Sequence, residues 1–262
     1  MRKYLIGLAV IATALITASV AFGVTERTFK MNFATSATGT PTTKPNSATG
    51  LYLTEDSSDP ANSANNEQPR QDDKVTFGLP SGTALNKNAA AKCGASDQDF
   101  SQKGESACSK KSNVGSGNAK IRLRIPDSND IPASVTLFNG KGKTLITYVN
   151  PQGAQPIVLR STVNGKLGKN QTIVVPIPIS CVLGSPPNCD PNAGDARISH
   201  LDLTIKRVVR KKKKNGKTIK IPLIKTPKKC PASKTWTFTV AFHARDNSVT
   251  DNKTSDSPCK TK

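Results

Sequence analysis

The sequence is poor in aromatic residues and has only two histidines. Aromatic side chains make up 5% of its 262 residues, and there is a single Trp. A carbohydrate-binding platform needs exposed aromatic faces, and a single-stranded nucleic-acid site needs rings that stack on bases. The basic stretch at 206–229 contains no Phe, Tyr or Trp. We therefore expect no specific nucleic-acid partner, although phosphates attract any strongly basic surface.

Motifs for catalysis and nucleotide binding are also missing. The chain has no Gly-x-Ser-x-Gly nucleophile turn. Gly142-Lys143-Thr144 and Gly216-Lys217-Thr218 match only the end of a phosphate-binding loop, because the required earlier glycine is Leu137 or Lys211. We expect no catalytic residue and no cofactor. The alternative is a secreted hydrolase whose carboxylates, dispersed along the chain, converge in the fold.

Metal-ligand spacing is absent, whereas cysteines are present in an even number. There is no Cys-x-x-Cys, and His200 and His243 each stand alone in a strand-like run, so no metal site is expected. The chain has six cysteines, and an even number of cysteines is typical of disulfides when a chain is exported. Proximity along the chain favours three pairs: Cys93 with Cys108, Cys181 with Cys189, and Cys230 with Cys259.

The N-terminus indicates export. Arg2 and Lys3 are followed by an apolar, uncharged run at 4–20, and small residues at 19–21 suit signal peptidase. We expect residues 1–21 to be a cleaved signal peptide and 22–262 to be one mature domain that is secreted, extracellular or associated with the envelope. The alternative is an uncleaved membrane anchor, since the run is close to the shortest length that spans a bilayer. No second apolar stretch of that length follows, so no membrane span is expected after cleavage.

Short runs that alternate apolar and polar residues predict half-buried strands. Ile121, Leu123 and Ile125 alternate with basic residues, and Trp236, Phe238 and Phe242 share one face of a later run. Further runs lie at 28–33, 51–54, 74–79, 134–138, 144–149, 157–163, 172–179, 201–206, 217–223 and 248–250. Turns rich in Asn-Gly and Pro favour hairpins over helical crossovers. We predict an all-β, disulfide-stapled antiparallel sandwich, with Greek-key or meander connections.

Two kinds of segment depart from this pattern. Residues 39–47 and 56–73 contain few apolar side chains and are predicted to be mobile surface loops. Residues 89–108 are rich in Ala and predict one or two short helices, held by Cys93 and Cys108.

The residues around several cysteines resemble a known sequence pattern. Cys108, Ser112, Val114-Gly115, Gly117 and Ala119 resemble a Cys-Pro-x-x-Ser-x-Val-Gly-x-Gly-x-Ala pattern, with Ser109 in place of the Pro. Leu79-Pro80-x-Gly82, and Cys230-Pro231 followed by Trp236-x-Phe238, Phe242 and Cys259, are similar landmarks. The pattern resembles a family of uncharacterised exported proteins of high-GC Gram-positive soil bacteria. The resemblance implies an all-β fold and no activity, cofactor or partner. From its position, we expect Gly115-Ser116-Gly117 to be a hinge before a strand that starts near Ala119.

Basic residues are unevenly distributed. The net charge is +20, and twelve Lys or Arg lie between 206 and 229 without one Asp or Glu. Asn215-Gly216 predicts a two-residue hairpin turn that places Lys214 opposite Lys217 and Lys211 opposite Lys220. The candidate contact residues for an anionic envelope polymer are Lys206, Arg207, Arg210, Lys211, Lys212, Lys213, Lys214, Lys217 and Lys220. The alternative is a ribbon that only keeps the protein soluble and protects a sheet edge. We expect a non-enzymatic extracellular or envelope-associated β-domain.

The first prediction concerns export. Cleavage after the small residues should leave a mature protein that begins near Phe22, because the charged, apolar, small-residue order ends there. N-terminal sequencing of protein from the culture fluid measures this. Recovery of membrane-bound protein that retains Met1 would contradict it.

Overall fold

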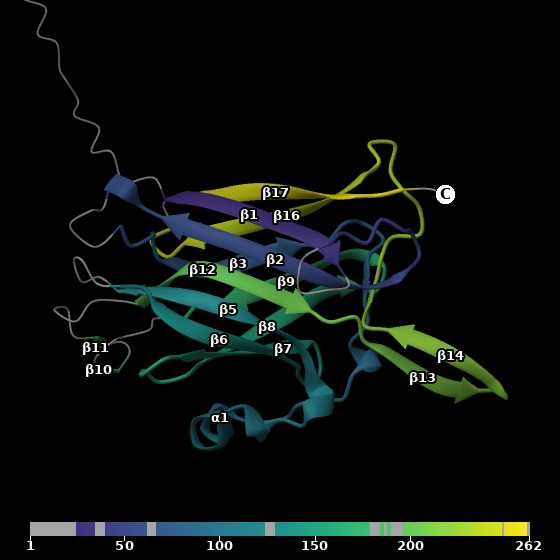
Figure 1. Ribbon diagram of the computed structural model, residues 1–262, viewed down its shortest axis with the longest axis horizontal. Helices are drawn as coiled ribbons and strands as arrows, with labels where there is room; N and C mark the ends of the chain where they lie inside the picture. The colour runs from purple at the N-terminus through teal and green to yellow at the C-terminus, as the bar shows by residue number, and fades with distance from the viewer. Residues whose placement is uncertain are drawn as a thin grey trace, which may run out of the picture.

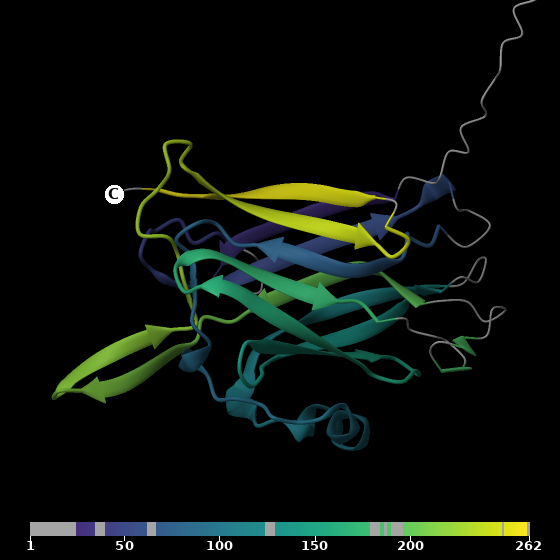
Figure 2. The same cartoon turned by 180° about the vertical axis from the view of Figure 1, so that it is seen from behind.

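The computed structural model confirms the predicted fold class. It describes residues 25–34, 40–61, 67–123, 129–178, 184–185, 188–189, 196–247 and 249–260. These residues form a mostly antiparallel β-sandwich with one short α-helix (Figures 1 and 2). Within the described part, no helix combines the length and the apolar character that crossing a membrane requires.

The elements follow one another along the chain in this order. The strands are β1 (Glu26–Ala34), β2 (Ala48–Ser58), β3 (Asp72–Gly78), β4 (Ala84–Leu85), β5 (Asn113–Leu123), β6 (Ile131–Asn139), β7 (Thr144–Pro151), β8 (Ile157–Lys166), β9 (Lys169–Pro176), β10 (Gly184–Ser185), β11 (Asn188–Cys189), β12 (Ala196–Ile205), β13 (Val209–Lys214), β14 (Lys217–Pro222), β15 (Ile224–Lys225), β16 (Thr235–Ala244) and β17 (Thr250–Pro258). The helix α1 (Asp97–Lys103) and the 3-10 turns η2 (Lys87–Ala89), η3 (Gly104–Ala107) and η4 (Lys110–Ser112) lie between β4 and β5.

The main sheet runs almost completely around the core. Its hydrogen-bonded order is β17-β16-β3-β9-β8-β7-β6-β5-β12-β2; β1 then pairs with β2 along most of its length, and the two-residue strands β15 and β4 continue from the first residues of β2. Every neighbouring pair in this series is antiparallel. The two end strands, β1 and β17, lie side by side (Figure 1). The sandwich is therefore a flattened ring of strands with a single seam.

Serine hydroxyls on β17 hold the seam. Ser255 Oγ accepts a hydrogen bond from the Met31 amide at 2.9 Å and donates one to the Met31 carbonyl at 2.9 Å. Ser257 Oγ accepts from the Phe33 amide at 3.2 Å. Met31, Phe33 and Ser257 are buried, so water cannot replace these partners. The two serines thus supply the edge of β1 with the hydrogen bonds that a neighbouring backbone would otherwise give.

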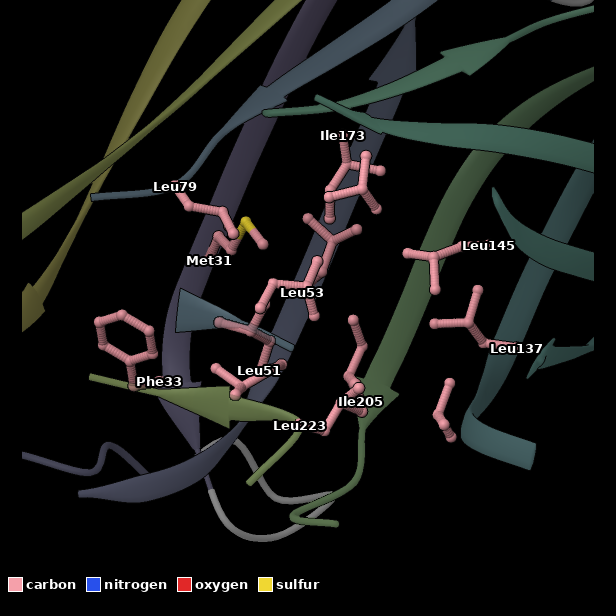
Figure 3. Packing of buried hydrophobic residues seen from close by; sticks show 14 of the residues in the cluster. Met31, Phe33, Leu51, Leu53, Leu79, Leu137, Leu145, Ile173, Ile205 and Leu223 are labelled. Atoms are coloured by element: carbon pink, nitrogen blue, oxygen red, sulfur yellow. The ribbon is translucent and has the colours of Figure 1, made fainter. Parts of the chain in front are cut away.

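One end of the ring interior is filled mainly by large apolar side chains. Met31, Leu51 and Ile205 come from neighbouring strands and point toward one another, as Figure 3 shows. Phe33 packs edge-on against Trp236 and Phe238, with ring centroids 5.2 and 4.9 Å apart. Each of these side chains is at most 6% exposed. Burial of this many large apolar groups supplies the main driving force for closure of the ring.

The segment around α1 covers the outer face of β6 and β7. Ser96 caps the helix through the Asp99 amide, and Asp99 Oδ2 accepts from the Ser96 amide at 2.8 Å, which completes a capping box. Phe100 is fully buried and packs against Phe138 and Tyr148. The predicted short helix at 89–108 is confirmed.

Two of the three predicted disulfides are confirmed. Cys93 is bonded to Cys108, which ties the α1 segment at both ends, and the Cα atoms lie 5.3 Å apart. Cys230 is bonded to Cys259 across the hairpin of β16 and β17, with a Cα separation of 5.6 Å. Cys181 lies outside the described residues, so its bond to Cys189 stays a prediction.

Several predicted boundaries differ from the structure. The loop predicted at 56–73 is shorter, because β2 continues to Ser58 and β3 begins at Asp72. In the loop predicted at 39–47, the described residues are anchored: the Thr43 carbonyl accepts from the Lys260 amide at 2.9 Å, and the Lys44 carbonyl accepts from Thr226 Oγ1 at 2.9 Å. The last strand was predicted only at 248–250, but β17 is a full-length polar strand.

The glycine hinge predicted at 115–117 is wrong. Both glycines lie inside β5, which begins at Asn113 and pairs with β12. A Cβ on Gly117 would lie 1.8 Å from the Asp202 carbonyl oxygen, and one on Gly115 would lie 2.6 Å from the Thr204 carbonyl oxygen. The glycines are therefore required by the close approach of two strands.

We predict that the serine seam contributes measurably to stability. Replacing Ser255 and Ser257 together by Ala leaves the Met31 and Phe33 amides without partners and should lower the free energy of unfolding by about 2 to 4 kcal/mol. Urea unfolding measures the loss. Ser101→Ala on the exposed surface of α1 is the control. A double variant as stable as this control would contradict the role of the seam.

Candidate functional site

The Lys-rich hairpin projects from the sandwich as a separate two-stranded ribbon. β13 pairs only with β14 among the described strands, and Figure 1 shows the ribbon extending beyond the end of the main sheet. Lys214 lies opposite Lys217, Lys211 opposite Lys220, and Val209 opposite Pro222, as predicted. The hairpin register predicted from Asn215-Gly216 is confirmed.

Backbone geometry explains the tight turn. Asn215 has φ 49° and Gly216 has φ 73°, so both central residues adopt the left-handed conformation that a type I′ turn requires. Asn and Gly tolerate this conformation better than other residues do. The turn matches the right-handed twist of the flanking strands.

Both faces of the ribbon are basic and exposed. Arg210, Lys212 and Lys214 share one face with Lys217, while Lys211 and Lys213 share the other with Lys220. All seven are exposed. No ion pair in the described part of the chain includes any of them. The cross-strand lysine pairs repel each other, and an anion placed between them would relieve that repulsion.

Not all the predicted contact residues lie on the ribbon. Lys206 and Arg207 follow the end of β12 and precede β13, so the paired strand starts at Val209. Lys206 Nζ donates to Asn113 Oδ1 at 3.0 Å, which directs it toward the sandwich. Arg207 is exposed. The nine candidate residues are thus seven on the ribbon and two in the link at its base.

The ribbon has a rigid base. Leu223 and Ile224, directly after β14, are fully buried in the main core. The Leu223 carbonyl accepts from the Asn86 amide at 2.6 Å, and Ile224 in β15 pairs with β2 and β4. Because the base is buried and the tip is exposed, changes at the tip should leave the fold intact.

The backbone carbonyls around Gly142-Lys143-Thr144 accept hydrogen bonds from a lysine of the same chain. Lys87 Nζ donates to the Gly142 carbonyl at 2.9 Å, and it also contacts the Gly140 and Thr144 carbonyls. Burial lowers the pKa of Lys87 to about 8, and the nearby charge of Lys92 adds to this effect. The carbonyls of this turn point at an ammonium group, the opposite of an anion cradle.

A cavity of about 170 Å³ lies inside the ring at the end opposite the large apolar side chains of the core. Its lining is mostly apolar and includes Leu203, Val175 and Leu159. Charged residues line one part of it. Arg27 Nη2 donates to Asp72 Oδ2 at 2.9 Å, and the Arg27 guanidinium lies 4.1 Å from the centre of the Phe242 ring. This buried ion pair was not predicted, because its residues lie in different polar runs of the sequence.

Glu55 also lines this cavity. Burial raises its pKa to about 7, although Arg27 and Ser57 act in the opposite direction. Burial also raises the pKa of Asp72, again against Arg27. A hydrolase needs two carboxyl groups that reach the substrate, one as acid and one as base or nucleophile. Asp72 is engaged by Arg27, so Glu55 is left as the carboxyl available to the cavity.

The two histidines lie in separate environments. His200 Nδ1 lies 2.6 Å from Asp56 Oδ1, and His243 Nδ1 lies 3.2 Å from Thr250 Oγ1. Throughout the described residues, no group of three or more His, Cys, Asp or Glu is arranged to hold a metal ion.

The raised pKa of Glu55 predicts a specific pH dependence of stability. Between its unfolded value of 4.5 and about 7, the folded state binds more protons, so this group's contribution to stability falls as pH rises through that window. Relative to the parent protein, Glu55→Gln should gain about 2 to 3 kcal/mol between pH 4 and pH 8. Urea unfolding at both pH values measures this, with exposed Glu26→Gln as the control. A difference between Glu55→Gln and parent that is the same at both pH values would contradict the prediction.

Comparisons with known proteins supply no relative on which to base a function. No family model matches the chain, and neither the curated proteins nor the solved structures contain a significant match.

Proposed function

We propose that the protein is an exported, non-enzymatic β-domain that binds an extended anionic polymer of the cell envelope through the hairpin of β13 and β14. The main support is the projection of seven exposed cations on a ribbon whose base is buried in the core. This arrangement exposes positive charge on two faces of the ribbon and keeps the repulsion between these charges away from the sandwich. Membership of the exported family suggested by the cysteine landmarks is part of the same proposal.

The dimensions of the ribbon suit an extended ligand. Six residues of β13 span about 20 Å at 3.3 Å per residue. Successive side chains alternate between faces, so a flexible chain of phosphates could meet cations along either side. Each contact releases counterions and adds a salt-dependent term to the binding free energy. Multiple weak contacts of this kind give affinity without a shaped pocket.

Other features agree with an extracellular location. Two disulfides form within the described residues, and disulfides persist mainly in oxidising compartments. Both enclose segments whose cores are small, the α1 segment and the C-terminal hairpin. A chain exposed to the medium benefits from such covalent restraint.

The test replaces Lys211, Lys212, Lys213 and Lys214 together by Gln. Binding to purified anionic cell-wall polymer should weaken, and the slope of log K against log salt should fall by up to about 3 if all four side chains contact phosphates. Affinity is measured by titration calorimetry from low to physiological salt. Thermal unfolding should remain close to that of the parent, because the tip lies outside the core.

A matched variant separates position from net charge. Replacing the exposed residues Lys30, Lys110, Lys111 and Lys120 by Gln removes the same charge from other surfaces. The hairpin variant should lose more affinity than this control. Equal losses in the two variants would indicate nonspecific attraction. No loss in the hairpin variant at any salt concentration would identify the ribbon as a solubility and edge-protection device.

A further inference from the structure

The two ends of the ring interior are packed differently. At the end near Phe33, the inward-facing side chains are almost completely buried. Toward the other end, Leu201, Leu203 and Val175 face inward from β12 and β9 but remain partly exposed. They are exposed to the cavity, which separates the two layers at this point. A second cavity of about 60 Å³ shares Leu203 and Val175 with the first and is also lined by Met31, Leu51 and Ile205, so the hollow continues in part to the end that these three residues occupy.

The size and lining of the cavity fit a small apolar guest. An engineered apolar cavity of about 150 Å³ in another protein stays dry and binds benzene. The cavity here has a volume of about 170 Å³ and is lined by aliphatic and aromatic groups such as Leu53, Phe77 and Leu159. The groups that line an empty space of this size lose van der Waals contacts on the side that faces it. A guest of one aromatic ring would restore those contacts.

Glu55 gives the guest a polar attachment point. It is on β2 between Leu53 and Ser57, and all three line the cavity. No ion pair of the described residues includes Glu55, whereas Arg27 and Asp72 beside it are paired with each other. A carboxyl group that titrates near neutral pH can accept or donate a hydrogen bond. A hydroxyl group can do both as well, so it matches Glu55 in either state.

We propose that the interior cavity binds a small, uncharged, mostly apolar molecule that carries one hydroxyl group, with its apolar part among Leu203, Val175 and Leu159 and its hydroxyl on Glu55. An ionised head group would lose its hydration among mostly apolar walls, which disfavours it even though Arg70 and Arg197 also line the cavity beside the Arg27–Asp72 pair. This site is independent of the hairpin and of polymer binding.

The probes are benzyl alcohol, toluene, benzoate and benzylamine, which have one ring and different head groups. Binding to the full mature protein is followed by methyl NMR, which also locates the guest. Benzyl alcohol should bind about fivefold more tightly than toluene, the factor that one ordinary hydrogen bond supplies. It should shift the methyl signals of Leu203 and Val175. Benzoate and benzylamine should bind more weakly than benzyl alcohol.

Two matched pairs of variants test the site. Val175→Phe fills the cavity and should abolish binding, whereas Val249→Phe on the surface, where Val249 is 50% exposed, should not. Glu55→Leu should remove the preference for benzyl alcohol over toluene, whereas Glu26→Leu should keep it. Thermal unfolding confirms that each variant is folded, and the methyl shifts of the parent protein test the location even if Val175→Phe does not fold.

Four results would overturn the proposal. The first three are no binding of toluene or benzyl alcohol to the parent protein, binding that Val175→Phe leaves unchanged, and a preference among head groups that is unaffected by Glu55→Leu. Tighter binding of benzoate or benzylamine than of benzyl alcohol would also overturn it, since it would show that the site selects a charge.

Discussion

The architecture depends on how an odd number of antiparallel strands closes on itself. Eleven strands of the described chain surround the core, from β1 through β2 and β12 round to β17. When each strand is antiparallel to the next, the first and the last of an odd number of strands must run in the same direction. The contacts of Met31 with Ser255 and of Phe33 with Ser257 show this parallel order. Side-chain hydroxyls take the place of a backbone ladder there, so closure of the whole fold depends on two serines and the apolar packing behind them.

The parts of the fold that could be predicted from sequence are those encoded by local patterns. Trp236, Phe238 and Phe242 alternate with polar residues, and all three are buried as predicted. Asn215-Gly216 specifies its turn and register through two neighbouring residues. Cysteine pairs close along the chain join segments that the intervening turns bring back together. Each of these inferences needs only the residues inside one segment.

The remaining parts could not be predicted because their cause lies elsewhere in the chain. β17 lacks alternating apolar residues, because it bonds to the edge of β1 through serine hydroxyls and does not fill the core with apolar side chains. Gly117 looked like a hinge, but its reason is the backbone of β12 about 85 residues later, near Asp202. Likewise Glu55 lies in a polar stretch of the sequence, and only closure of the sheet around the core places it at an internal cavity, which residues of β3 such as Phe77 also line. Contacts between segments so far apart leave no periodic signal in either segment.

The burial of Leu223 and Ile224 at the base of the ribbon has a mechanical consequence. The ribbon connects β12 to β15, and both of these strands pair with β2. A force applied to the tip would therefore pass into β2 through both ends of the ribbon, at six residue pairs with β12 and two with β15. The ribbon is thus fixed at both ends to one strand of the main sheet, and neither end hangs from a loop alone.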